Sequence, residues 1–205
     1  MRIEEVPRQW LLLIYRLPAE PSRMRTYIWR QVKALGSLYF QQAVWLLPKT
    51  ERLEEEFKRL VAKIEEFGGE ASLLTAVSPS LTWEDRVISS FDEARNEEYA
   101  EIVENEERFE DEIRRETRKE KFTFAEMEEL EAEWERLKRW HERVRERDFF
   151  EAPGRKEAEA RLEEGERLLE GFTRRVYERQ GVEEIPGEEA NNRGETSDVP
   201  DLNEY

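Results

Sequence analysis

Apolar residues in the second half of the chain recur at alternating intervals of three and four, which is the spacing of one buried helix face. The clearest stretch runs from Phe124 to Arg147. Its seam is formed by Met127, Leu130, Trp134, Leu137, His141 and Val144. Thr123 and Glu126 have the spacing of a capping box, which marks the start of this helix. The pattern predicts a helix that buries one stripe against partner helices.

Two further seams of the same kind flank this helix. One begins after Asp92, and the other follows a turn at residues 148–154 that contains proline and glycine. The two seams consist of Tyr99, Ile102, Glu106, Phe109 and Ile113, and of Ala158, Leu162, Gly165, Leu169, Phe172 and Val176. Because short turns make neighbouring helices antiparallel, we expect a long antiparallel three-helix bundle within residues 79–180.

Before Ser78 the pattern changes to short apolar runs that alternate with helices. Residues 10–15 are continuously apolar between Pro7 and Pro18, which indicates a central strand covered on both faces. There follow a helix over 22–35, a hairpin over 37–47, a helix after Thr50 and a strand over 70–77. This βαββαβ order is that of the ferredoxin-like unit, with four antiparallel strands and both helices on one face. The predicted fold class is α+β, with a ferredoxin-like domain in residues 1–78 ahead of the bundle.

The ends of these units have their own composition. A hinge is expected at residues 78–81, between the sheet and the bundle. Residues 181–205 contain eight acidic residues and two prolines, and this predicts an acidic disordered tail. The alternative is a pseudo-substrate segment that folds back over a basic groove on residues 1–78.

Each bundle seam departs from apolar chemistry once, at Glu106, His141 and Gly165. Counting from the turns places these positions at one height. We therefore expect a polar bundle layer in which the Glu106 carboxylate accepts a hydrogen bond from His141 and Gly165 leaves room for it. Such a layer commonly fixes helix register at some cost in stability. A pH- or ligand-responsive layer is the alternative, because imidazole titrates near neutral pH.

The net charge of −16 is unevenly distributed. Residues 1–78 hold 12 basic and 10 acidic residues, whereas residues 79–180 hold 21 and 32. Because an acidic surface repels phosphates, contact with DNA is expected through residues 1–78 only. The chain has no cysteine, which is typical of a reducing cytoplasm, and residues 10–15 are too short for a membrane span. We expect a cytoplasmic protein that does not enter a membrane.

The sequence offers little support for catalysis. Gly68 and Gly69 lack the lysine and the spacing of a phosphate-binding loop, and neither a Ser/His/Asp set nor an HExxH motif is visible. One histidine and no cysteine leave zinc almost without ligands. We therefore expect a non-enzymatic protein that uses no cofactor and no metal.

The informative cluster is basic and lies on or before the first helix. It consists of Arg16, Arg23, Arg25, Arg30 and Lys33. Arginine suits oxyanions because its planar guanidinium donates two parallel hydrogen bonds, and a helix N-terminus adds backbone amides. These residues are candidates for binding an oxyanion or nucleic acid; the alternative is that they pair with nearby glutamates or extend into water. Tyr27 and Trp29 lie among them, either to stack on a base or to pack in the core or an interface.

Several segments in order along residues 8–179 carry a family resemblance. They include WLLLIYRLP at 10–18, VWLLP at 44–48, NEEYAEIV at 96–103, KFTFAE at 121–126 and RDFF at 147–150. Together they resemble the N-terminal region of the chromate-resistance protein ChrB. The resemblance implies a role in chromate resistance, full-length members being chromate-responsive regulators of a resistance operon. Those members carry a second, C-terminal domain where this chain has its acidic tail, so we expect a protein partner that supplies the domain.

Residues 1–78 are also similar to the middle domain of PaaX-type repressors and to the nuclease subunit of CRISPR adaptation. That nuclease has a metal-binding Asp at the end of its first strand. Tyr15 and Arg16 stand at this place in the chain, which disfavours a nuclease.

Two functions remain. The first is a regulatory or sensing module for chromate or a similar oxyanion such as sulfate. The second is an interaction scaffold without a small ligand, in which a homodimer or hetero-oligomer pairs through the open edge of the sheet or through the bundle. Tyr39 and Trp45 would then lie in the interface.

Overall fold

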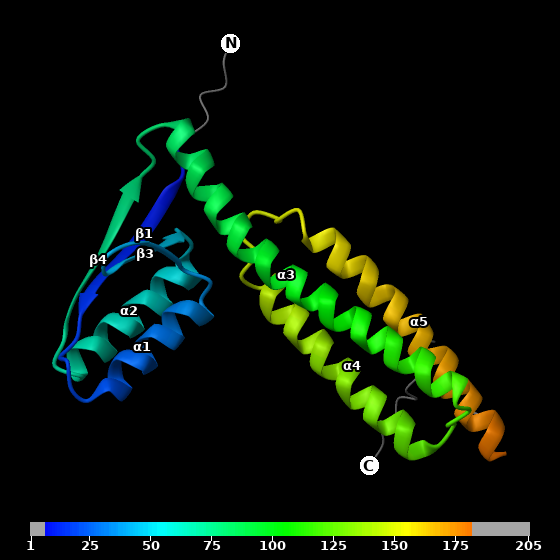
Figure 1. The fold of residues 1–205 in the computed structure, drawn as a ribbon. Coiled ribbons are helices and arrows are strands. Elements are labelled where there is room, and N and C mark those ends of the chain that lie inside the picture. Colours follow the sequence, from blue (N-terminus) through cyan, green and yellow to red (C-terminus); the bar gives the residue numbers. More distant parts are fainter. Residues whose placement is uncertain (1–6, 182–205) are drawn as a thin grey trace, which may run out of the picture.

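The computed structural model describes residues 7–181 and consists of a four-stranded sheet with two helices, followed by three long helices (Figure 1). The elements are β1 (Gln9–Arg16), α1 (Ser22–Ala34), β2 (Leu38–Gln41), β3 (Val44–Pro48), α2 (Glu51–Glu66), β4 (Glu70–Val77), α3 (Leu81–Arg118), α4 (Phe124–Arg145) and α5 (Arg155–Gln180). The predicted fold class is confirmed, because a ferredoxin-like βαββαβ unit precedes a helical bundle. Residues 182–205, which hold nearly all of the predicted acidic tail, lie outside the described residues.

The sheet has the strand order β2-β3-β1-β4, and all three strand pairs are antiparallel. β1 is central, as its continuous apolar run predicts. α1 and α2 cover one face of the sheet, and an apolar core fills the space between them. This core contains Leu11, Leu13, Ile28, Val32, Trp45, Leu47, Leu53, Phe57, Leu60 and Ile64. Burial of one such side chain contributes roughly 1.5–3 kcal/mol, so this layer is the main source of stability for the unit.

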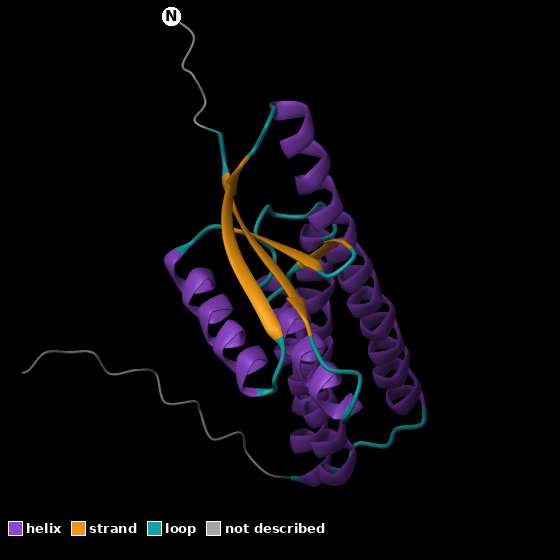
Figure 2. Ribbon diagram, turned by 90° about the vertical axis from the view of Figure 1, so that its left-hand side faces the viewer, coloured by secondary structure: helices purple, strands orange, loops and turns teal. Residues whose placement is uncertain are grey.

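The opposite face of the sheet is covered only in part, by the long helices (Figure 2). Trp10 is fully buried there between Phe91 of α3 and Phe150, with ring centroids 6.0 and 6.1 Å away. Its indole nitrogen donates a hydrogen bond to Ser78 Oγ at 2.8 Å. Near the other end of β1, Ile14 remains 36% exposed. The prediction that β1 is covered on both faces is therefore confirmed at Trp10 and wrong at Ile14, because the bundle packs against the Trp10 end alone.

α3 begins at Leu81 and not at Asp92, so the predicted hinge is only a short turn before the helix. Ser80 caps the helix, because its side chain accepts a hydrogen bond from the Trp83 backbone N–H at 3.2 Å. The first turns of α3 pack Val87 and Phe91 against the sheet. These turns belong to the core of the sheet unit, which is why the bundle seam does not extend through them.

The bundle seams are buried as predicted. Every seam residue of α3 and α4 is buried, and α5 buries its seam except at the half-buried Leu162. α4 runs antiparallel to α3, and α5 runs antiparallel to α4 (Figure 1). No helix in the described part of the chain combines the length and the apolar character that a membrane crossing requires.

Candidate anion-binding site

The five basic residues of the predicted cluster separate in the structure. Arg16 lies at the end of β1, where it forms an exposed ion pair of 2.7 Å with Glu70. Arg23 and Arg25 lie exposed at the start of α1, whereas Arg30 and Lys33 lie near its end. Because a 13-residue helix is about 20 Å long, one small anion does not contact both ends. The prediction of a single five-residue cluster is wrong, since β1 and the two ends of α1 point to different places.

Arg30 and Lys33 line a hollow between the C-terminal ends of α1 and α4, which lie side by side (Figure 1). The hollow has a volume of about 490 Å³. Four basic and two acidic side chains surround it. Its lining consists of Trp29, Arg30, Lys33, Ala34, Glu98, Arg143, Glu146 and Arg147. The hollow is therefore basic and is built jointly by the ferredoxin-like unit and the bundle.

A glycine allows the two walls of the hollow to approach each other. Gly36 follows α1 with φ of +77°, the left-handed conformation in which a glycine commonly ends a helix. A Cβ added at Gly36 would lie 2.8 Å from Cβ of Arg147. The aliphatic part of Arg147 thus packs directly on the backbone after α1, and a larger residue at this position would push the walls apart.

Arg147 is held in place by protein groups. Its guanidinium contacts both carboxylate oxygens of Glu98, at 3.2 and 3.1 Å, and its Nε donates to the Arg143 carbonyl at 2.8 Å. The buried Arg95 has its Nη1 3.2 Å from Glu98 Oε2. Burial lowers the pKa of Arg95, and the Glu98 carboxylate opposes this shift. Glu98 and Arg147, which line the hollow, are therefore already paired with protein groups.

The other cations that line the hollow, Arg30, Lys33 and Arg143, differ from Arg147 in their pairing. Within residues 7–181 none of the three forms an ion pair, and all are exposed. Lys33 and Arg143 lie in the last turns of α1 and α4, where cations also stabilise the helix dipole. The contribution of helix N-terminal amides expected from the sequence does not apply to this hollow, because both helices present their C-terminal ends. Anion binding here depends on the side-chain cations.

The aromatic residues near this cluster have different environments. Tyr27 packs edge-on against Phe67, with ring centroids 5.9 Å apart, whereas Trp29 is half exposed and borders the hollow. On the hairpin, Tyr39 is 57% exposed but Trp45 is buried in the core. The suggestion that Trp45 serves an interface is therefore wrong, because its side chain faces α1 and α2.

The predicted polar layer is buried, but its two titratable members do not meet. Glu106 lies against Gly165, where an added Cβ would overlap its Oε1, and neither carboxylate oxygen has a hydrogen-bond partner among the described residues. His141 lies instead beside Tyr99, with ring centroids 5.9 Å apart. Tyr99 precedes Glu106 by one heptad, which is about 10 Å of helix. The room that Gly165 leaves for Glu106 is confirmed, and the hydrogen bond between Glu106 and His141 is wrong.

The two groups of this layer respond to burial in opposite directions. Burial and the nearby Glu110 raise the pKa of Glu106 to about 7, against a smaller opposing effect of Arg161. Burial lowers the pKa of His141, so its imidazole is neutral at neutral pH. Both groups therefore favour their uncharged forms, and neither neutralises the other.

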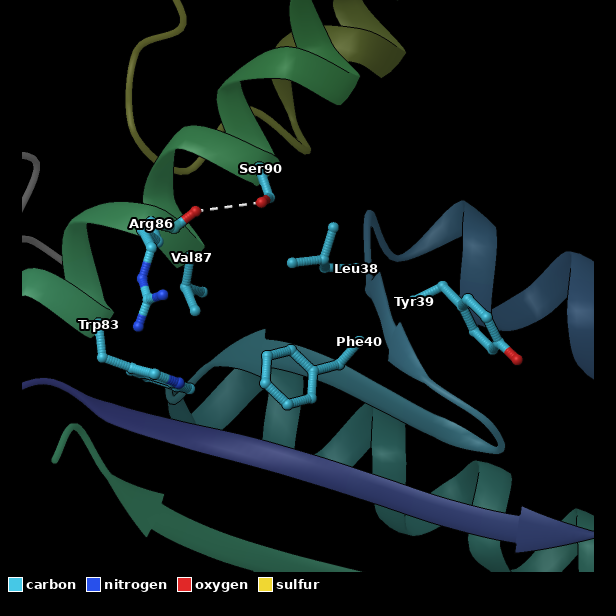
Figure 3. Close-up of a pocket in the computed structure, with 7 residues that line it drawn as sticks. All are labelled: Leu38, Tyr39, Phe40, Trp83, Arg86, Val87 and Ser90. Carbon is cyan, nitrogen blue, oxygen red and sulfur yellow. Dashed lines mark hydrogen bonds between the residues drawn. The ribbon is translucent and has the colours of Figure 1, made fainter.

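A second hollow lies between β2 and the start of α3 (Figure 3). Its walls are mainly apolar and aromatic. They are formed by Leu38, Tyr39, Phe40, Trp83, Arg86, Val87 and Ser90. Phe40 and Trp83 approach edge to face with centroids 6.0 Å apart, while the Ser90 hydroxyl is bonded to the Arg86 carbonyl. One cation among apolar groups gives this hollow little capacity to hold an anion.

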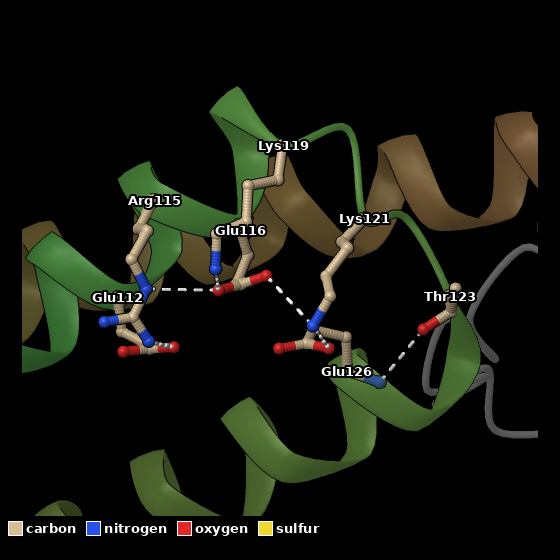
Figure 4. A network of polar contacts seen from close by, with 7 residues as sticks. All are labelled: Glu112, Arg115, Glu116, Lys119, Lys121, Thr123 and Glu126. Carbon is tan, nitrogen blue, oxygen red and sulfur yellow. Dashed lines mark hydrogen bonds and ion pairs between the residues drawn. The ribbon is translucent and has the colours of Figure 1, made fainter.

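An acidic cluster at the far end of the bundle stabilises the turn between α3 and α4 (Figure 4). Carboxylate oxygens of Glu112, Glu116 and Glu126 lie within 4.8 Å of one another, the spacing of a metal site. Glu116, however, accepts a hydrogen bond from Lys119 at 2.7 Å and lies 3.4 Å from Lys121 Nζ. The hydrogen bond from Lys119, with contributions from Arg115 and Lys121, lowers the pKa of Glu116 to about 2. Protein cations neutralise this cluster. It is therefore better described as a set of ion pairs at the ends of α3 and α4 than as a metal centre.

Comparison with known proteins addresses the whole arrangement. The family model described as "Protein ChrB, N-terminal" matches residues 25–183. The chain belongs to the ChrB N-terminal family. It is also similar to Protein ChrB of Cupriavidus metallidurans, with 32% identity over 92 residues, which are 45% of this chain and 28% of that protein. No solved structure gives a significant match.

The ChrB N-terminal family match extends from α1 to the end of α5. Both walls of the basic hollow therefore lie inside it, whereas Arg16 and Arg23 lie before it. The chain covers less than a third of the matched ChrB protein. Sequence reasoning missed Arg143 and Arg147 because they are 110 residues or more from Lys33 along the chain, and only the docking of α1 beside α4 brings them together.

Proposed function

We propose that this chain is a non-enzymatic sensing module linked to chromate resistance, and that it binds chromate or a similar oxyanion in the basic hollow. The observation that carries the proposal is that Arg30, Lys33 and Arg143 line one hollow and form no ion pair within residues 7–181. Chromate and sulfate are tetrahedral dianions, so two or three converging cations suit them. Membership of the ChrB family supports chromate as the ligand.

The place of the hollow supports a regulatory role. Its cations come from α1 of the ferredoxin-like unit and from α4 of the bundle, so a bound anion would favour the docked arrangement of the two. The exposed Arg23 and Arg25 leave the start of α1 available for DNA or for a protein partner. We infer that anion binding stabilises the docked arrangement of the two units and that the partner recognises this arrangement.

Absence of catalysis is part of the proposal. Tyr15 and Arg16 end β1, and the Arg16 guanidinium is paired with Glu70. That position therefore offers a cation where a metal-dependent nuclease needs a carboxylate. A cleavage assay on DNA and RNA with Mg²⁺ or Mn²⁺ is expected to give no products, and cleavage that depends on the metal would contradict this part.

Calorimetric titration with sodium chromate and sodium sulfate tests the binding site. We expect micromolar binding by the wild type and a loss of about tenfold or more in affinity for Arg30→Ala with Arg143→Ala, because each removes a charge-assisted hydrogen bond. The matched control is Arg23→Ala with Arg25→Ala, which removes two exposed arginines at the start of α1 and is expected to bind normally. Absence of binding at millimolar anion, or equal loss in both double variants, would contradict the proposal.

A further inference from the structure

The outer edge of β4 is unusually open for a strand of this length. β4 has eight residues and pairs with β1 along its whole length without an irregularity. Within residues 7–181, no backbone or side-chain hydrogen bond reaches its other edge. Leu74 and Val77 are 50% and 54% exposed. Free N–H and C=O groups along such an edge form a template for another strand.

The composition of β4 lacks the usual protection against pairing. Edge strands are commonly short, interrupted by a bulge or proline, or carry lysine. β2, the opposite edge, has four residues and a register shift between Tyr39 and Gln41. In β4, by contrast, the seven residues from Ala71 to Val77 include neither a charge nor a proline. One edge of the sheet is thus protected and the other is not.

We propose that two copies of this chain pair through β4 in antiparallel orientation, with Leu74 opposite Leu74 of the second copy. Directly opposed residues of antiparallel strands share a face of the sheet, so a twofold axis at Leu74 also places Ser72 opposite Ala76. The pairing forms one continuous eight-stranded sheet and joins the two half-exposed Leu74 side chains.

Charge along β4 is compatible with a second copy at this edge, because the residues from Ala71 to Val77 are uncharged. With a net charge of −16, two copies repel each other across most of their surfaces. In the pairing centred on Leu74, Glu70 lies opposite Ser78 of the second copy, whose backbone N–H is bonded to the Arg8 carbonyl. No two like charges are opposed along the strands. β4 also lies at the edge of the sheet away from most of the acidic bundle (Figure 1).

Closure limits the assembly to a dimer. The contact uses the same edge on both copies and so satisfies both at once, while the short and irregular β2 edge does not extend it. This pairing is independent of the anion in the basic hollow, because β4 contributes no residue to that hollow.

Single-cysteine cross-linking tests the pairing, since the natural chain has no cysteine. Opposed Cα atoms in such a pair lie about 4.5–5.5 Å apart, within the range of a disulfide. Leu74→Cys is expected to form a covalent dimer under mild oxidation. Tyr39→Cys, which is comparably exposed on the opposite edge, is expected to form no covalent dimer. Equal cross-linking of both variants, or of neither, would overturn the proposal.

Sedimentation velocity on the full chain gives a second measurement. We expect a concentration-dependent dimer whose dissociation constant rises about tenfold or more in Leu74→Lys, because two lysines then face each other across the axis. Tyr39→Lys is the control and should dimerise normally, with circular dichroism confirming that both variants fold. A wild-type chain that stays monomeric at its highest soluble concentration, or a dimer that survives Leu74→Lys, would exclude this interface.

Discussion

At the scale of single residues, the carboxyl group of Glu106 has the least ordinary environment in the bundle. It is fully buried, neither oxygen is hydrogen-bonded within the described residues, and Glu110 lies nearby. An ionised carboxylate without partners is costly in such a place. Glu106 therefore retains its proton up to about neutral pH, and this has a consequence for stability.

The contribution of Glu106 to stability is predicted to fall as the pH rises from about 4.5 to about 7. Glu106 has its ordinary pKa of 4.5 when the chain is unfolded and a pKa of about 7 when folded. The folded state thus binds a proton that the unfolded state releases, and the contribution of Glu106 to the free energy of unfolding decreases over this range by about 3 kcal/mol, while the lowered pKa of His141 acts in the opposite direction. Urea denaturation at several pH values measures the decrease.

Glu106→Gln removes this titration, so the variant should gain stability relative to wild type as the pH rises from 4.5 to 8. Glu101→Gln is the control, because Glu101 is exposed on the same helix and should leave the slope unchanged. Parallel pH profiles for wild type and Glu106→Gln would contradict the assignment.

The two glycines of α5 provide a second prediction. A Cβ at Gly165 would overlap Glu106 and lie 2.8 Å from Trp134 Cζ3, whereas a Cβ at Gly171 meets no atom within 4 Å. Gly165→Ala is therefore expected to destabilise the chain by about 2 kcal/mol through overpacking. Gly171→Ala should stabilise it by up to about 1 kcal/mol, because alanine favours helix. Thermal or urea unfolding distinguishes the two signs, and a stabilised Gly165→Ala would show that the close contact is absent.

The heptad pattern was sufficient to identify the unusual seam residues, but not to pair them. Glu106, His141 and Gly165 stand out because each interrupts an apolar repeat. Successive seam residues on a helix are only about 5 Å apart, so a small error in the turn moves one helix by a whole layer. Glu106 consequently meets Gly165, as expected, while His141 lies one heptad away beside Tyr99.

At the scale of elements, α3 is the helix that joins the two units. Its first turns pack on the sheet and its later turns form the bundle, so it changes partners along its length. The sequence signals for its true start are Ser80 before the helix and the spacing of Val87 and Phe91. Val87 and Phe91 do not continue the alternating three-and-four spacing of the bundle seam. A search for one continuous seam therefore places the start of α3 too late.

Removal of the α3 cap tests this boundary. Ser80→Ala is expected to lower the free energy of unfolding by about 1 kcal/mol, because the Trp83 N–H loses its acceptor. Ser89→Ala, at an exposed position inside the helix, should be neutral or slightly stabilising because alanine has the higher helix propensity. If Ser80→Ala had no larger effect than Ser89→Ala in urea titrations, the helix would not begin at this residue.

At the scale of the whole molecule, aromatic packing holds the sheet and the bundle together. Phe91 stacks on Trp10 and also contacts Phe149 and Phe150, at centroid distances between 5.5 and 6.0 Å. Phe91→Ala is expected to cost about 3–5 kcal/mol and to separate a single unfolding transition into two. Phe124→Ala is the control, since Phe124 is 37% exposed at the far end of the bundle and should cost much less. Equal losses in both variants would mean that this contact does not couple the units.

Long-range docking is also where prediction of the site failed. The fold class, strand order and helix seams follow from local periodicity and turn residues. The basic hollow depends on the approach of the C-terminal ends of α1 and α4, and no sequence pattern indicates that these distant segments lie near each other. The sequence allowed Arg30 and Lys33 to be identified as candidate cations. It did not single out Arg143, because α4 carries many other charged residues.

The central claim is that an oxyanion binds between α1 and α4, and arginine Nε–Hε NMR spectra recorded during sulfate and chromate titration test it most directly. The account predicts saturable shifts of the Arg30 and Arg143 resonances together, with smaller shifts for Arg147 and none for Arg23 or Arg25. Shifts centred on Arg23 and Arg25, or no shift at millimolar anion, would contradict it.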